Sequence, residues 1–182
     1  MMKKVLFILI FFTSLYANDY DRFFYEYKNN NLIDACRIGK KIYTQRVERD
    51  EKLLSVIGNV CLKADYIDTV GTIQSRLRKT KEARINAVVF SAVVLQKRLI
   101  YQFMYDNTDI SMFTLPVFNH PLSDTFVAIR DKEYKIISLN PKVIEFYKRD
   151  KFYKVYMDKD DDGRLVIETT DRYGNVKEHR YL

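Results

Sequence analysis

The sequence predicts an α+β fold: an N-terminal antiparallel helical array followed by a small antiparallel β-sheet with one short helix. Within residues 18–107, apolar side chains recur with a period near 3.6, which is typical of helices. Within residues 125–182, apolar and polar side chains alternate, as in half-buried strands. Residues 108–124 follow neither period and contain two of the three prolines, so we expect an irregular linker there.

The start of the chain has the three parts of a secretory signal peptide, and we assign residues 1–17 to it. Lys3 and Lys4 form a positive region, Val5–Phe12 an apolar core, and Ala17 ends a stretch with small residues where cleavage is expected. A retained N-terminal anchor is the alternative. With cleavage, we expect an exported, periplasmic protein without a transmembrane segment.

The 182 residues carry a formal net charge of +7, to which Lys3 and Lys4 contribute +2. The sequence has no Arg-rich tract and no basic stripe interleaved with aromatic residues. Together with export, this argues against a nucleic-acid partner. Weak attraction to acidic partners or anionic lipid remains open.

Four helices are expected before the central one, and their bounds are Asp19–Asn29, Leu32–Arg46, Asp50–Lys63 and Asp65–Arg78. Gly39 falls on the apolar face of the second helix. Because glycine in a helix interior costs about 1 kcal/mol relative to alanine, its presence predicts a close helix crossing.

The central helix is expected at Lys81–Asn107, a stretch without Pro or Gly. Its middle is apolar nearly all round, which predicts packing on more than one side. A membrane span is the alternative. However, the uncharged run Ile85–Gln96 is shorter than the roughly 20 residues that cross a bilayer.

The two cysteines, Cys36 and Cys61, both lie on apolar faces of expected helices. In an oxidising compartment such a pair usually forms a disulfide. A C-x-x-C redox pair is absent, so we expect a structural bridge. Two free buried thiols are the alternative.

Two helix starts, near Leu32 and Asp65, are about 33 residues apart. The segment Leu54-x-x-Ile57-Gly58-x-x-Cys61 resembles the L-x-x-L-G-x-x-Y core of tetratricopeptide and Sel1-like helical repeats, over residues 20–105. The resemblance implies a helical scaffold that binds another protein, and the cysteine pair suits secreted versions of such repeats. An irregular helical bundle is the alternative.

The C-terminal region is expected to form about five strands. We predict a hairpin with strands at 125–130 and 134–139 and a turn at Asp131 and Lys132, then a short helix Pro141–Arg149 with proline at its first position. A meander follows, with strands Phe152–Met157, Arg164–Thr170 and Val176–Leu182. One short strand, Phe113–Phe118, is expected in the linker. The apolar face of the sheet is expected to pack on the central helix.

An acidic motif, D-x-D-x-D-G, places Asp158, Asp160 and Asp162 at alternate positions before Gly163. It matches the first half of an EF-hand loop, whose carboxylates converge on calcium. At the twelfth position Thr169 stands where a bidentate Glu is required, and strands flank the loop. The motif therefore predicts either a calcium site in a β-hairpin or a plain acidic turn.

Catalysis has little support in the sequence, and we predict no catalytic residue. His120 and His179 lie in different segments, and each is expected to be a surface or locally hydrogen-bonded histidine. Glu145, Asp150 and Glu168 could pair as in a glycosidase, but no spacing argues for it. A cell-wall-acting hydrolase is the least favoured function.

Two clusters of aromatic residues, the second interleaved with basic residues, are candidate partner-binding surfaces, because Tyr and Arg are enriched in interface hot spots. Core packing with a solvated basic edge is the alternative. The candidate residues are Phe23, Phe24 and Tyr27 near the mature N-terminus, and Tyr147, Arg149, Tyr153 and Lys154 in the C-terminal region.

These observations favour a non-enzymatic exported adaptor or structural subunit that binds another envelope protein or assembly. Accessory rings of flagellar motors and envelope-biogenesis complexes use small exported helical proteins, and they serve here as analogies only. The alternative is a periplasmic calcium- or ligand-binding module centred on the Asp158–Gly163 loop.

Overall fold

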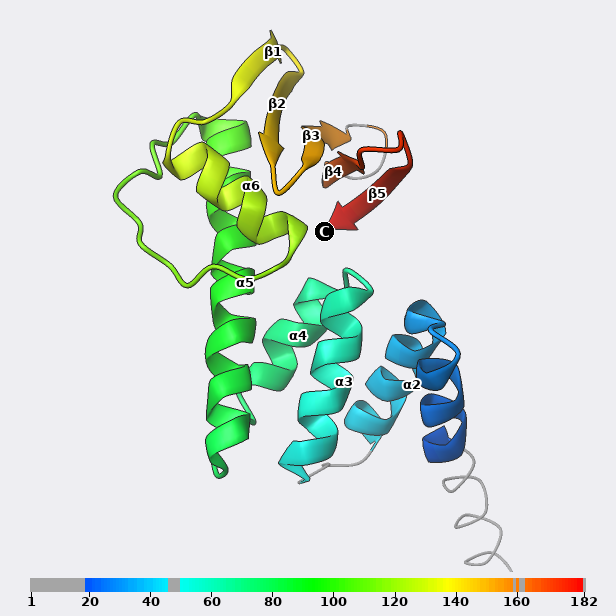
Figure 1. The fold of residues 1–182 in the computed structure, drawn as a ribbon. Helices are drawn as coiled ribbons and strands as arrows, with labels where there is room; N and C mark the ends of the chain where they lie inside the picture. The colour runs from blue at the N-terminus through cyan, green and yellow to red at the C-terminus, as the bar shows by residue number, and fades with distance from the viewer. Residues whose placement is uncertain (1–18, 46–49, 159, 161–162, 182) are drawn as a thin grey trace, which may run out of the picture. The chain divides into compact units, whose positions relative to one another are not determined.

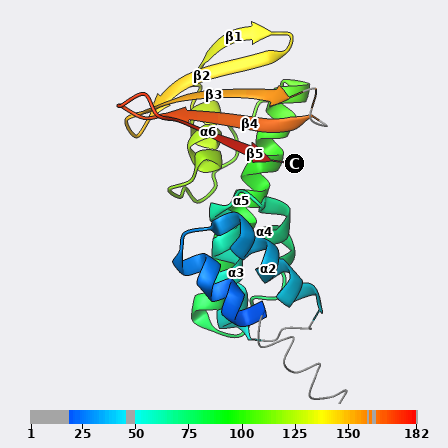
Figure 2. The ribbon, with the colours of Figure 1, turned by 90° about the vertical axis from the view of Figure 1, so that its right-hand side faces the viewer.

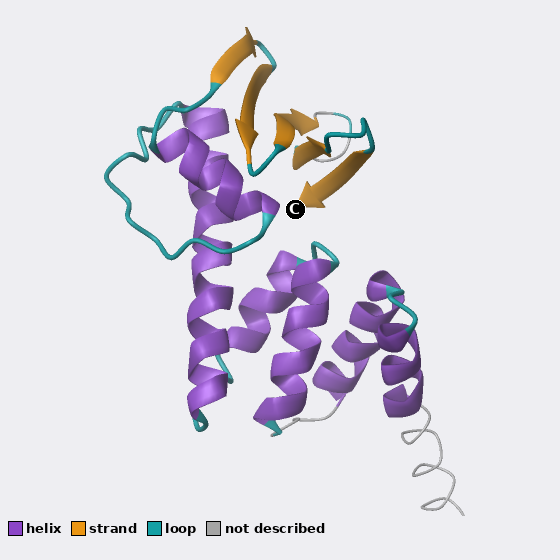
Figure 3. Cartoon of the chain, in the orientation of Figure 1, coloured by secondary structure: helices purple, strands orange, loops and turns teal. Residues whose placement is uncertain are grey.

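A computed structural model describes residues 19–45, 50–158, 160 and 163–181, so the expected signal peptide lies outside the described residues. The α+β class is confirmed: helices precede a five-stranded antiparallel sheet (Figures 1 and 3). The chain divides into two compact units, Met1–Asn86 and Ala87–Leu182. Helix α5 (Lys81–Asp106) begins in the first unit and continues through the second.

The first unit is helical, as the 3.6-residue period predicts. Residues 19–28 are helical and are followed by α2 (Leu32–Gln45), α3 (Glu51–Lys63) and α4 (Ile67–Gln74). Asp50 caps α3, its carboxylate accepting the Lys52 N–H at 2.9 Å. The buried apolar side chains include Phe23, Ala35, Ile42, Leu54, Ile57, Ile67, Val70, Ile73 and Leu77.

Gly39 lies where α2 crosses α3, and the predicted close contact is confirmed. A Cβ at this position would come within 2.8 Å of the Ile57 side chain and 3.1 Å of the Phe23 ring. Both neighbours are completely buried and have little room to move. The absence of a side chain at Gly39 therefore allows the two helices to approach.

Helix α4 is shorter than expected because the Glu51 carboxylate binds the backbone that follows it. Glu51 accepts the N–H groups of Arg78, Lys79 and Thr80 at 2.8–3.0 Å. These hydrogen bonds, led by that from Arg78, lower the pKa of Glu51. The expected helix Asp65–Arg78 ends at Gln74, and its last residues form the turn that Glu51 holds.

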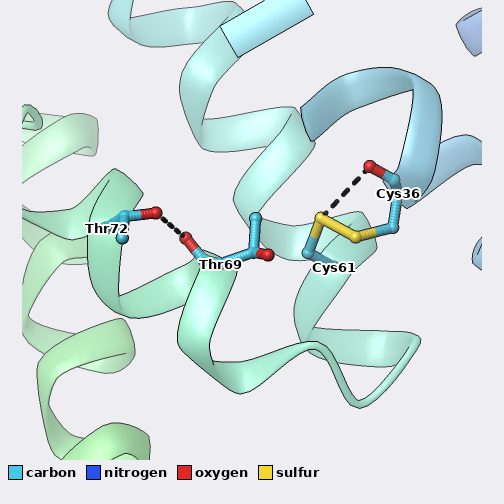
Figure 4. Close-up of a disulfide and its surroundings, with 4 residues drawn as sticks. All are labelled: Cys36, Cys61, Thr69 and Thr72. Atoms are coloured by element: carbon cyan, nitrogen blue, oxygen red, sulfur yellow. Dashed lines mark hydrogen bonds between the residues drawn. A yellow bond between two sulfur atoms is a disulfide. The ribbon is translucent and has the colours of Figure 1, made fainter. Parts of the chain in front are cut away.

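The predicted disulfide is present and joins Cys36 of α2 to Cys61 of α3, with Cα atoms 4.8 Å apart (Figure 4). Both cysteines are buried, and the Cys61 sulfur lies 3.8 Å from the Cys36 carbonyl oxygen. In the same view, the Thr72 hydroxyl donates to the Thr69 carbonyl in α4 at 2.8 Å. The bridge links helices that are also in direct contact, so it reinforces an existing packing.

Replacing both cysteines by serine is expected to lower the free energy of unfolding by about 3 kcal/mol. The disulfide joins residues separated by 25 positions and so restricts the entropy of the unfolded chain, and this restriction is lost in the variant. Chemical denaturation of the oxidised protein and of the double variant measures the difference. A loss well below 1 kcal/mol would contradict a stabilising bridge.

The second unit contains a sheet whose strands lie side by side in chain order (Figure 2). The strands are β1 (Lys135–Leu139), β2 (Lys142–Lys148), β3 (Lys151–Asp158), β4 (Arg164–Thr170) and β5 (Val176–Tyr181), and every neighbouring pair is antiparallel. The predicted meander is confirmed as β3, β4 and β5. Strands β1 and β5 are the two edges.

Three predicted elements in this unit are wrong. The residues expected as a strand at 125–130 belong to a helix, α6 (Pro121–Arg130), and the expected helix Pro141–Arg149 is strand β2. Pro141 instead forms a two-residue turn with Asn140, joined by a cis peptide bond. The segment 113–118 has no strand.

Helix α6 forms because its ends are well capped. His120 is the N-cap and its Nδ1 accepts the Leu122 N–H at 3.2 Å, while Pro121 occupies the favoured first helical position. At the other end, Lys132 has φ +59°, and the Glu133 N–H closes back on the Ala128 carbonyl at 2.8 Å. These caps override the alternating pattern within the helix.

The expected irregular linker has no regular structure up to residue 118, and hydrogen bonds anchor its second half to both helices (Figure 3). Gln96 of α5 donates to the Pro116 carbonyl at 2.8 Å and accepts the Ser123 hydroxyl of α6 at 2.7 Å. The same hydroxyl accepts the Phe118 N–H at 3.2 Å. Because Gln96 and Ser123 are fully buried, this network fixes the path of the loop.

The end of α5 is held by Lys142 from β2. Its ammonium group donates to the Phe103 carbonyl and to the Asn107 side chain, both at 2.7 Å, and lies over the Phe103 ring. A cation is favourable at a helix C-terminus. Burial lowers the pKa of Lys142.

Helix α5 is less enclosed than its composition predicts. Ile85, Val88 and Leu95 are exposed on one side, whereas Lys97 is buried. Among the described residues, α5 is the one helix that could span a membrane by length and composition, and half of its most apolar stretch is buried. A core helix of a soluble protein meets the same criterion.

Candidate functional site

The predicted aromatic cluster near the N-terminus is divided between core and surface. Phe23 is completely buried, so its prediction as a partner contact is wrong: it fills the space beside Gly39. Phe24 and Tyr27 are partly exposed and touch the Phe23 ring, with centroids 5.1 and 6.4 Å away. Only these last two could contribute to a surface.

The second predicted cluster contains a buried polar contact that holds α6 against the sheet. Asp124 of α6 accepts the Tyr153 hydroxyl at 2.8 Å, and Arg149 Nε lies 2.9 Å from its other oxygen as an ion pair without hydrogen-bond geometry. Burial and the Asp124 contact raise the pKa of Tyr153. The prediction of Tyr153 as a partner contact is wrong, because the side chain is buried. Arg149 remains exposed at the surface while its guanidinium pairs with the buried Asp124.

Lys154 belongs to a row of charges on the face of the sheet that points away from α6, which we call the open face. Register places Lys135, Glu145, Lys154, Glu168 and Glu178 opposite one another across the five strands. The first four alternate in sign, which favours pairing between neighbouring strands.

The acidic loop is described only in part, because Asp162 lies outside the described residues. Asp158 binds Arg180 at 2.8 Å and accepts the Asp160 N–H at 3.1 Å. Gly163 has φ +68°, as the sharp turn requires. Among the described residues, no three His, Cys, Asp or Glu side chains converge as a metal would need. The calcium site therefore stays a prediction.

Both histidines are buried on the side of the sheet that carries Tyr181. His120 caps α6, and the His179 ring stacks parallel to Tyr181 at 6.4 Å. The local hydrogen bond expected for His120 is present. This arrangement gives both rings structural contacts.

The edge strand β1 of the second unit exposes three aliphatic side chains. Ile136, Ile137 and Leu139 are 48%, 56% and 75% exposed. A bulge interrupts the pairing of β1 with β2 between Ile136 and Ser138. On the outer side of β1 no described strand follows. This edge was missed because the sequence pattern assigned β1 to the middle of a sheet.

A cavity of about 480 Å³ lies where β1 begins. Its aromatic lining includes Tyr147, which is 77% exposed and meets the Phe152 ring at 5.1 Å. Its other lining residues are Lys132, Glu133, Tyr134, Lys135, Glu145 and Phe146. An aromatic cavity with a few charged groups at its wall is typical of a binding site. Of the predicted contact residues, Tyr147 is the one that lines it.

Comparison of the chain with known protein families, with curated proteins and with solved structures found no match. The resemblance to tetratricopeptide and Sel1-like repeats therefore stays a prediction.

Tyr153→Phe is expected to lower the free energy of unfolding by about 1–3 kcal/mol, because it removes a hydrogen-bond donor from the buried Asp124 carboxylate. Urea denaturation measures the loss, with Tyr173→Phe at an exposed turn as the control. Equal stability of the two variants would show that the contact contributes nothing.

Tyr156 makes the stability of the fold sensitive to alkaline pH. Burial and its hydrogen bond to Glu168, at 2.8 Å, raise the pKa of Tyr156 to about 12. An unfolded phenol ionises near pH 10. The stabilisation by neutral Tyr156 is therefore complete below about pH 10 and is lost as the pH rises through about 12.

Tyr156→Phe is expected to reduce this alkaline loss of stability. Urea denaturation at several pH values between 9 and 12 measures the slope for the wild type and the variant. Tyr173→Phe should keep the wild-type slope, because its ring is exposed. An unchanged slope in Tyr156→Phe would contradict the proposed role.

Proposed function

We propose that this protein is a non-enzymatic, exported adaptor or structural subunit that binds another protein of the cell envelope through the β1–β2 end of its sheet. The observation that carries the proposal is the apolar edge strand β1, with three exposed aliphatic side chains beside an aromatic cavity.

The two edges of the sheet differ in a way that supports this assignment. Strand β5 carries Lys177, Glu178 and Arg180 on exposed positions, and charged residues oppose the addition of another strand. Strand β1 has one charged residue, Lys135, and three exposed aliphatic ones. An exposed apolar edge promotes aggregation of a free protein, whereas in a binding protein it serves as the contact surface for the partner.

Export is supported by two independent features. The first 17 residues have the composition of a signal peptide, and the disulfide suits an oxidising compartment. The buried ionisable groups Glu51, Asp124 and Lys142 are each bound by groups of the same unit. These contacts stabilise the fold, which supports a structural rather than a catalytic role for the three residues.

Photo-crosslinking in intact cells tests the docking surface. A photoreactive amino acid at Tyr147 is expected to crosslink the tagged protein to one defined envelope protein, because Tyr147 lies at the cavity. The same substitution at Tyr173 is the matched control: it is 74% exposed, against 77% for Tyr147, but lies in the turn between β4 and β5.

Mass spectrometry of the crosslinked bands identifies the partner. Crosslinks from Tyr147 and few or none from Tyr173 support the proposed surface. Equal crosslinking from both positions, or none from Tyr147 at normal abundance, would contradict it.

A further inference from the structure

We infer that β1 receives an extended segment of the partner as a sixth, antiparallel strand, with an acidic residue opposite Lys135, an apolar residue opposite Ile136 and a large apolar side chain in the cavity. This inference rests on the proposed function and adds the chemistry of the partner. The mode is β-strand addition, in which backbone hydrogen bonds bind the segment and side chains select it.

The backbone of β1 is suited to a short addition. It is the first strand in the sheet order, so its outward N–H and C=O groups face no described strand. The bulge between Ile136 and Ser138 interrupts regular pairing along the strand. Bulges protect edges from indiscriminate association. Binding must therefore draw specificity from the side chains at the start of β1.

The charge expected opposite Lys135 follows from the open face of the sheet. From β4 to β1, the row reads Glu168, Lys154, Glu145 and Lys135, which alternates in sign. Opposite charges placed directly across two strands are favourable, and like charges are unfavourable. Within the described part of the chain, Lys135 forms no ion pair, so an acidic residue on the added strand would continue the row.

The covered face of the sheet gives the second requirement. Ile136 lies opposite Ile144, which in turn lies opposite Val155. Ile144 and Val155 are completely buried, whereas Ile136 is half exposed at the end of this row. An apolar residue on a sixth strand would cover Ile136 and remove its side chain from water.

The cavity gives the third requirement. Tyr147 and Phe152 of the cavity lie on the same open face as Lys135, and side chains on one face of a strand are two residues apart. In an antiparallel strand, the side chain that enters the cavity therefore comes two residues after the one opposite Lys135, level with Glu133, which also lines the cavity. The volume of about 480 Å³ is ample for one aromatic side chain. The preferred segment therefore reads apolar, acidic, any residue, aromatic from its N-terminus.

A second copy of the chain does not meet these requirements. The strand Lys135–Leu139, with sequence KIISL, contains no acidic residue, so pairing β1 with its copy leaves Lys135 without a counter-charge. The chain is also basic, with a net charge of +7 of which Lys3 and Lys4 in the expected signal peptide contribute +2, so two copies repel each other. An acidic segment of another protein is favoured on both grounds.

The test uses the full mature chain and a capped heptapeptide, Thr-Thr-Val-Glu-Ser-Phe-Thr. Nitrogen-15 NMR follows the amides of β1 during titration and their exchange with solvent. We expect saturable shifts at Lys135–Leu139 and slower exchange there. A peptide with Lys in place of Glu should bind about fivefold more weakly. A peptide with methylated backbone nitrogens should not bind, because it cannot complete the strand.

A charge reversal gives the sharpest outcome. Lys135→Glu should bind the Lys peptide more tightly than the Glu peptide, whereas Lys177→Glu on the opposite edge should keep the wild-type preference. Thermal melting confirms that both variants, altered at exposed positions, remain folded.

Three results would overturn strand addition: no shifts at β1, equal binding of the methylated peptide, or an unreversed preference in Lys135→Glu. Dimerisation in sedimentation experiments that Leu139→Lys abolishes would assign the edge to a second copy instead. If crosslinks from Tyr147 still identify an envelope protein, the adaptor proposal stands without this binding mode; if both fail, the surface itself is wrongly assigned.

Discussion

The apolar face of the five-stranded sheet must be covered, and α6 covers it, while the end of α5 also contacts the sheet through Tyr101 and Phe103. The main strand contacts of α6 are with β2 and β4, and every residue from Leu122 to Ile129 is buried. The helix brings the Asp124 carboxylate into this interior, where Tyr153 and Arg149 bind it. Truncating such a buried partner is costly, because the remaining polar group loses its hydrogen bond. The contact thus fixes α6 on the sheet, and the position of α6 determines which strands are covered.

The placement of α6 over β2 and β4 leaves β1 as the open edge of the sheet. Strand β1 pairs with β2 alone, and its aliphatic side chains reach solvent on both faces. The loop that precedes α6 is held by Gln96 and Ser123, and Lys142 binds the end of α5, so this part of the second unit is rigidly built. A rigid support with an exposed edge lowers the entropic cost of binding an extended segment. The exposed edge of the candidate site therefore results from the way α6 packs on the sheet.

Much of this fold follows from the sequence, and the errors have a common physical cause. Helices α2 and α3 and strands β3, β4 and β5 were predictable because their apolar residues recur with a period of 3.6 or 2. Helix α5 was predictable because its apolar residues keep the helical period over a long stretch without Pro or Gly. Helix α6 is buried all round, so it has no amphipathic period and its β-branched residues resemble a strand. Strand β2 follows Pro141, which also suits the first position of a helix. Lys142, Ile144 and Phe146 occupy every second position of β2 and share its buried face. This period of two was the signal for the strand that was overlooked.

The binding surface was less predictable because composition does not distinguish the two faces of a strand. Tyr153 and Phe152 are neighbours in sequence, yet Tyr153 faces α6 and Phe152 lies across from Tyr147 on the open face. Which of them is buried depends on the side from which α6 approaches, and that information is absent from local periodicity. The same reasoning applies to Lys135: it is an ordinary surface lysine in the sequence, and only the register of the five strands places it at the end of an alternating row. The row makes the missing partner of Lys135 an acidic one, and the sequence of β1 shows that a second copy of this strand does not supply it.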